Sequence, residues 1–428
     1  MTSTLRVTRH LTGAGEPHVG RLLLDAVHLV ERALKASRGE PSVVRAADTS
    51  SPLDPDKVRC EAAMLLRALM PVADRHSWLP SALAGLAAEL ATSITDEWAV
   101  RLCLNPGIAL DLALVPLHLR AVGLGDRHLE PILADLLGGD RLPGPERTPN
   151  RQLEQHQLRS LWTGEVDEAG VARALAASSL AWEFDHLAGT TEDAYAFTHA
   201  ILYATDHGRR RVSLPRPSAQ IVRDADAILA VALDAGNHDV AAEVLWTWPM
   251  LNLPWTPLAG QAWAFLAHER KDWGFLPGPG FDPAVHHGLP CPERDGYVLR
   301  TSYHTTLVHG LLMAVIERRG GAVRPELVEG DAAVPAWGVA EAVSAVVQPS
   351  TTGASWWTRF ASLPPATRDS LASALTTIAL RRAVNRADLA AVRDALSLAA
   401  DFRLPETPVI RQARVLLRRA MAIAGLAH

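Results

Sequence analysis

Cysteine is scarce in this sequence of 428 residues, and its three cysteines show no spacing typical of paired cysteines. Cys60, Cys103 and Cys291 lie far apart in the chain, so no disulfide framework of a small secreted domain is predicted. Residues 1–20 have no apolar core of the signal-peptide type, and no uncharged run of about 18 apolar residues occurs. These absences favour a cytoplasmic protein without a membrane span.

Lysine is also scarce, and the chain carries no excess of positive charge. Lys35, Lys57 and Lys271 are the only lysines, and the formal net charge is −5. Without a basic field, neither nucleic acid nor an anionic membrane is an expected partner. Usage rich in arginine and alanine and poor in lysine is typical of a GC-rich bacterial genome.

Signals for β-strands are missing, because alternating Val, Ile and Thr are absent and aromatic residues make up only 5% of the chain. The apolar residues, 48% of the total with tyrosine and cysteine included, instead recur with helical period. We therefore predict an all-α protein. Besides a central helix described below, helices are predicted over residues 17–36, 56–75, 80–93, 97–104, 108–122, 127–137, 150–162, 168–183, 217–235, 239–248, 257–269, 302–319, 366–384, 388–401 and 406–424.

The predicted helices fall into two groups, separated by a stretch rich in glycine and proline at 138–149. We predict a flexible tail at 1–16 and an N-terminal helical bundle at 17–138. Short helix–turn–helix hairpins at Gly236–Asp239 and Asn385–Asp388 indicate an α/α toroid or an array of helical hairpins over 150–428.

The central helix, ending at Gly208, carries the best candidate site. Tyr195, His199, Tyr203 and Asp206 are spaced so that all four share one face of this otherwise apolar helix. His199 could move a proton or bind a metal ion, and Asp206 could bind a cation. The alternative is a buried hydrogen-bond network that fixes helix packing.

A second helix repeats this combination of residue types with Tyr303, His304 and His309. The two histidines are five residues apart, which excludes a simple zinc pair one turn apart. Either histidine could instead face His199 from an adjacent helix. We therefore predict His199, Tyr203, Asp206 and His304 as catalytic residues, with one divalent metal ion possible on His199, Asp206 and His304.

An irregular stretch at 271–301 and a group of tryptophans flank this candidate site in sequence. The stretch carries His286, His287 and Cys291, whose spacing matches no zinc-finger template, so a lid or wall loop is the alternative to metal binding.

Six of the 12 tryptophans fall between residues 182 and 273, and these are Trp182, Trp246, Trp248, Trp255, Trp263 and Trp273. Tryptophan usually fills cores, but these could also wall a pocket. The predicted pocket residues are Tyr195, Trp182, Asp185, Trp273 and His309.

The sequence Thr198-His199-x-x-x-Tyr203-x-Thr205-Asp206-x-Gly208 resembles a signature of an uncharacterised family of bacterial all-helical proteins. The resemblance covers about a dozen residues and implies only that this helix matters. The helix rhythm is also similar to that of α/α toroids such as terpene cyclases and prenyltransferases, a likeness at the level of fold. Their metal motifs are missing, as are nucleotide-binding, Gly-x-Ser-x-Gly and His-Glu-x-x-His motifs.

Two functions follow as hypotheses. The first is an enzyme of bacterial secondary metabolism that uses a cluster of His, Asp and Tyr in a Trp-lined helical cavity, with a small-molecule or peptide ligand. The second is a helical-repeat scaffold for protein–protein interaction, in which the same residues only pack helices.

Overall fold

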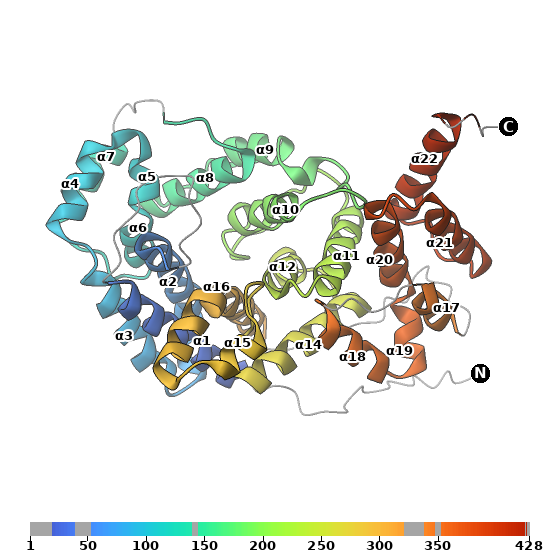
Figure 1. The fold of residues 1–428 in the computed structure, drawn as a ribbon. Coiled ribbons are helices and arrows are strands. Elements are labelled where there is room, and N and C mark those ends of the chain that lie inside the picture. The colour runs from blue at the N-terminus through green and yellow to red at the C-terminus, as the bar shows by residue number, and fades with distance from the viewer. Residues whose placement is uncertain are drawn as a thin grey trace, which may run out of the picture.

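The computed structural model describes residues 19–38, 53–138, 144–320, 338–346, 352–423 and 425. Within these residues the protein is helical and contains no strand, which confirms the all-α prediction (Figure 1). The α-helices are α1 (Val19–Ser37), α2 (Pro55–Leu69), α3 (Leu79–Ala91), α4 (Asp96–Leu104), α5 (Ala109–Leu112), α6 (Leu114–Ala121), α7 (Glu130–Gly138), α8 (Pro149–Thr163), α9 (Glu168–Ala176), α10 (Thr191–Ala204), α11 (Ser218–Asp234), α12 (His238–Val244), α13 (Thr247–Leu251), α14 (Pro257–Trp273), α15 (Pro283–Gly288), α16 (Cys291–Arg318), α17 (Val339–Val346), α18 (Ala354–Ser362), α19 (Pro365–Ser370), α20 (Ala372–Asn385), α21 (Leu389–Asp401) and α22 (Pro408–Ile423).

Short polar side chains set many of the helix starts. Thr190 and Asp193 form a reciprocal capping box at the start of α10, and Asn237 caps α12 by accepting from the amide of Val240. At the other end, Gly164 terminates α8 in the left-handed conformation that glycine adopts without steric strain. These local signals explain why most predicted helices lie within a few residues of the observed ones.

The clearest difference concerns the stretch predicted to be irregular at 271–301. It contains α15, and α16 begins at Cys291, eleven residues before its predicted start. Pro292 stands at the beginning of α16, where the missing N–H removes no helical hydrogen bond. The stretch 347–365, for which no helix is predicted, likewise contains α18. The predicted tail 1–16 and residues 321–335, between two predicted helices, lie outside the described residues.

One hydrophobic core extends through most of the described chain, from Leu22 in α1 to Ala413 in α22. The middle of α16 packs against both α1 and α2, and a Cβ atom on Gly310 would lie only 2.8 Å from the Cβ of Ala26. A second cluster joins α4–α7 to Leu158 of α8. The two predicted parts of the chain are therefore not separated into two hydrophobic cores, while the arrangement as toroid or array stays a prediction.

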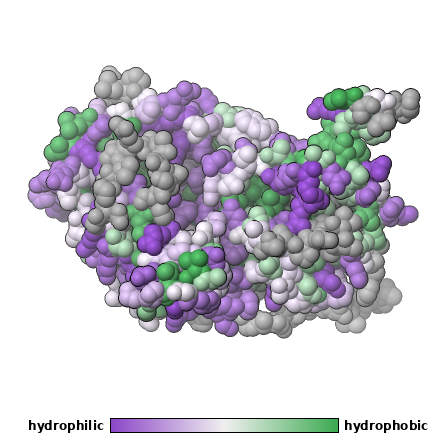
Figure 2. Space-filling model, in the orientation of Figure 1, coloured by the Kyte–Doolittle hydropathy of each residue, from purple (hydrophilic) through white to green (hydrophobic). Residues whose placement is uncertain are grey.

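The helices α10, α12 and α16 lie centrally, with α3–α7 at one end of the molecule and α20–α22 at the other (Figure 1). The end of α22 projects from the body, and Figure 2 shows hydrophobic surface along it on an otherwise largely hydrophilic face. No described helix combines the length and the apolar character needed to cross a bilayer.

Candidate metal centre

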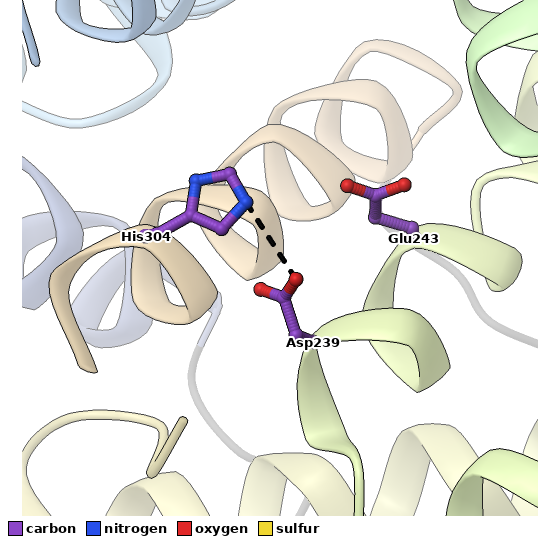
Figure 3. A group of neighbouring side chains, drawn as sticks. All are labelled: Asp239, Glu243 and His304. Carbon is purple, nitrogen blue, oxygen red and sulfur yellow. Dashed lines mark ion pairs between the residues drawn. The ribbon is translucent and has the colours of Figure 1, made fainter. Parts of the chain in front are cut away.

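Two acidic side chains of α12 face a histidine of α16 in the middle of the molecule (Figure 3). Asp239 and Glu243 are four residues apart and therefore project from the same side of α12. Together with His304 they offer three ligand atoms that all lie within 4.8 Å of one another. His304 Nε2 and Asp239 Oδ2 form an ion pair at 3.6 Å.

Both carboxylates are only 2% exposed, and hydroxyl groups hold each of them in place. Asp239 accepts hydrogen bonds from Tyr195 Oη at 2.7 Å and from Thr305 Oγ1 at 2.9 Å. Glu243 Oε2 accepts from Thr198 Oγ1 at 2.5 Å. A carboxylate oxygen has two lone pairs, so these bonds orient the acids and leave capacity for a further ligand.

His304 is oriented by a third carboxylate on its far side. Its Nδ1 lies 3.0 Å from Glu61 Oε1 of α2, which turns Nε2 toward Asp239. Burial lowers the pKa of His304, but the carboxylates of Glu61 and Asp239 outweigh burial and raise the pKa to about 9. In the absence of a metal ion the ring is therefore protonated at neutral pH. A carboxylate–histidine pair of this kind is the usual support for a metal-bound imidazole.

The predicted residues His199 and Tyr195 border this cluster from α10. His199 Nε2 lies 3.6 Å from Glu243 Oε2, and its side chain is 27% exposed. The ring stacks on Tyr195 with centroids 5.9 Å apart. Tyr203 is one turn further along and buried, and burial followed by the charge of Glu154 raises its pKa well above the ordinary value. The structure thus brings His199, Tyr195 and His304 together, as the sequence predicted.

Asp206 does not lie in this cluster, contrary to the prediction that it continues the face of His199. The helix ends at Ala204, and Asp206 follows it with a left-handed φ of 49°. Its carboxylate accepts two hydrogen bonds from Arg67 of α2, at 2.7 and 2.6 Å, and one from Gln157 of α8 at 2.8 Å. Burial raises the pKa of Asp206, but Arg67 outweighs it and the net pKa is well below the usual range. Asp206 thus links the end of α10 to α2 and α8 by hydrogen bonds.

The other predicted pocket residues are also dispersed. Trp182 is 56% exposed, and Asp185 accepts from the backbone amides of the turn at 187–188. Trp273 packs against the rings of Phe281, His286 and His287. His309 is fully buried with its Nδ1 3.0 Å from Arg270. These residues do not form the predicted tryptophan-lined wall around His199.

Sequence reasoning missed the acidic half of the cluster. Glu61, Asp239 and Glu243 come from α2 and α12, and they reach His304 only because both helices pack against α16. A usable signal was present, since Asp239 and Glu243 stand one turn apart in an otherwise mostly apolar stretch. Buried acids at that spacing require partners, which should have drawn attention to α12.

The donor set suits a divalent cation. Carboxylate oxygens and imidazole nitrogen together favour Mn²⁺, Fe²⁺ or Zn²⁺. The side chain of His304 is 31% exposed, so solvent reaches the cluster at its imidazole edge. Each ligand residue has a second partner that fixes its orientation, as metal sites require. The residues present therefore fit one divalent ion.

The model of the family described as "Domain of unknown function (DUF6895)" matches residues 23–314 of this chain. The match includes Glu61, Asp239, Glu243 and His304, and thus the whole cluster. No curated protein and no solved structure matches the chain.

Proposed function

This chain belongs to the DUF6895 family, and from its central cluster we propose that it is a metal-dependent enzyme with one divalent ion held by Asp239, Glu243 and His304. The observation that carries the proposal is the convergence of two buried carboxylates and an imidazole, within 4.8 Å, at a point that solvent reaches. An enzyme of bacterial secondary metabolism, the first hypothesis from the sequence, is kept as part of the proposal.

The charges around the cluster support a bound cation. Glu61, Asp239 and Glu243 supply three negative charges, against one on protonated His304 and one on Lys57, whose side chain is 46% exposed. An unbalanced buried carboxylate is expensive, because burial in a low dielectric disfavours the charged form. A divalent ion bound to His304 would displace the proton of that ring, and its two charges together with Lys57 would balance the three carboxylates. The ion would also accept lone pairs that the hydroxyl donors leave free.

A metal ion bound here would act as a Lewis acid that polarises a substrate oxygen or lowers the pKa of a bound water molecule. His199 stands beside Glu243 with part of its ring exposed, so it is the group placed to take a proton from the reacting molecule. Tyr195 holds Asp239 by its hydroxyl group, which keeps that carboxylate turned toward His304. Glu61 does the same for His304 through Nδ1.

Metal analysis and calorimetry test the proposal directly. We expect the purified protein to carry close to one equivalent of a transition metal, and the stripped protein to bind Mn²⁺ or Zn²⁺ with 1:1 stoichiometry. His304→Gln and Asp239→Asn each remove a ligand, and should weaken binding by more than about a hundredfold. The matched control is His268→Gln on α14, which removes an exposed imidazole paired with Asp272. Wild-type affinity in either ligand variant, with circular dichroism showing a normal fold, would refute the metal site.

Glu61 provides a finer test, because it supports the ligand rather than binding the metal. We expect Glu61→Gln to retain 1:1 binding with an affinity about 10- to 100-fold lower. Unchanged affinity in this variant would mean that His304 is not held through Nδ1 as the geometry implies.

His199 separates catalysis from metal binding. We expect His199→Ala to keep its metal ion and its melting temperature, and to lose at least about a hundredfold in any activity identified from the gene neighbourhood. A variant that keeps full activity would remove His199 from the mechanism.

The scaffold hypothesis keeps one observation in its favour. Met421 and Ile423 at the end of α22 are 39% and 89% exposed, and Leu416 and Leu417 nearer the body are only half-buried. Exposed apolar helix ends often contact other proteins. If the ligand variants neither lose metal nor change any activity, the same measurements would favour this second function.

A further inference from the structure

A recess lies between the start of α10, one face of α11, the start of α12 and α20. Its empty volume is about 450 Å³, which includes its open mouth. Figure 2 shows hydrophobic surface set back in this region, where α11 runs, beside a hydrophilic rim near α20. None of its lining residues belongs to the metal cluster, so it is a separate feature of the molecule.

Small side chains create this space. Ala194, Ala227 and Ala232 face it from α10 and α11, with Ile228 and Val231 completing the apolar wall. A larger residue at any of the three alanines would fill part of the recess. These five side chains carry no hydrogen-bonding group, so this wall suits an aliphatic chain.

One of the lining residues, Arg381, is positively charged. The half-buried guanidinium of Arg381 lines the recess, and it donates to the backbone carbonyls of His186, at 3.1 Å, and Gly189. Within the described residues no carboxylate lies within ion-pair distance of it. Asp185 acts on Arg381 only at longer range, and its own carboxylate accepts from the backbone of residues 187–188. With five N–H groups and two carbonyl partners, Arg381 keeps donors for an anion.

A second donor lines the same recess. Asn237 caps α12 through its side-chain oxygen, which accepts from Val240, and this leaves its amide NH₂ group to donate. Carboxylates are the anions that a guanidinium binds with two parallel hydrogen bonds. A ligand that combines an aliphatic chain with one carboxylate would match both the apolar wall and Arg381.

We propose that this recess is a binding site for a small aliphatic carboxylate, with its chain among the alanines of α10 and α11 and its carboxylate on Arg381. The site is independent of the metal centre and does not require a metal ion.

Calorimetric titration with octanoate, octan-1-ol and octylammonium tests this assignment. We expect octanoate to bind 1:1 with a Kd of about 0.1–1 mM, at least about tenfold tighter than the alcohol or the amine. Arg381→Gln should remove the preference for the carboxylate without weakening the binding of octan-1-ol. The matched control is Arg386→Gln, which removes an exposed arginine just beyond the end of the same helix.

Because Arg381 also holds the loop at 186–189, a second variant is needed. Ala227→Leu fills the recess from α11 and leaves Arg381 intact, and we expect it to abolish octanoate binding while the melting temperature changes little. The assignment is overturned if octanoate shows no saturable binding up to about 10 mM, binds no better than octanol, or binds Ala227→Leu as it binds wild type.

Discussion

Asp206 lies just beyond α10, in a turn where Asp206, His207 and Gly208 all have positive φ. Two of these residues are not glycine, so the turn is strained and must be held by its surroundings. Arg67 binds the carboxylate of Asp206, and Arg318 of α16 donates to the carbonyl of His207 at 2.5 Å. At the scale of single residues, this turn links α2, α10 and α16, the helices that carry Glu61, His199 and His304.

Loss of the Asp206 charge should therefore destabilise the fold. We expect Asp206→Asn to lower the free energy of unfolding by about 2–3 kcal/mol, because Arg67, only 7% exposed, would keep its charge without a partner. Denaturant titration measures this change. The control is Glu168→Gln, which removes an exposed partner of Arg210 and should change stability by less than about 0.5 kcal/mol.

The pair of Asp206 and Arg67 contributes to the free energy of unfolding in a way that depends on pH, and the pKa of Asp206 fixes the direction of this dependence. The pKa of Asp206 is lower in the folded protein than its ordinary value of 3.8, so the folded state binds the proton less tightly than the unfolded state. The stabilisation is complete above about pH 5 and is lost as the pH falls through the lower folded value. We expect the stability difference between wild type and Asp206→Asn to stay constant above pH 5 and to shrink below about pH 4. A difference that grows on acidification would contradict this.

The sequence identified part of the candidate site at this scale. Tyr195, His199 and His304 were predicted because polar groups on apolar helices need partners, and they do meet in the structure. The choice of Asp206 as their acidic partner was wrong for a physical reason. Helical spacing fixes a face only while the helix continues, and here the helix ends two residues earlier.

At the scale of elements, α16 connects the two predicted parts of the chain. It runs for 28 residues, about 40 Å at the rise of an α-helix, and carries His304 near its middle. Its predicted start is too late, because Pro290 and Pro292 are typical of a loop. Prolines at the first turn of a helix are tolerated, so the sequence pattern alone could not decide between the two interpretations.

The close approach of α16 to α1 depends on Gly310. An added Cβ would lie 2.8 Å from the Cβ of Ala26 and 3.5 Å from Leu65 Cδ1. We expect Gly310→Ala to destabilise the protein by about 1–2 kcal/mol, because overpacking outweighs the gain in helix propensity.

A double-mutant cycle checks this explanation by denaturant unfolding. Ala26→Gly destabilises α1 by itself, but the double variant should be less destabilised than the sum of the two single variants, with a coupling energy of about 1 kcal/mol or more. Additive effects of the two substitutions would show that the contact with Ala26 is not the cause.

At the scale of the whole molecule, the fold class followed from composition and periodicity, whereas the way the helices assemble did not. The apolar face of a helix specifies that it packs but not on which neighbour, and α16 is separated from α1 and α2 by more than 200 residues. The shared core argues for one cooperative unit in the described chain. We expect thermal unfolding followed by circular dichroism and by tryptophan fluorescence to give a single coincident transition. Two separated transitions would instead support the predicted boundary at 138–149.

The proposed ligands come from residues 239, 243 and 304, and the support for His304 comes from residue 61, so synthesis must pass residue 304 before the centre can exist. A nascent chain that has released α2 and α12 but not α16 would expose these acidic groups without the imidazole of His304. The metal ion would then bind only after residue 304 has been synthesised. Fragments ending before residue 304 should emerge from the ribosome unable to compete for the ion.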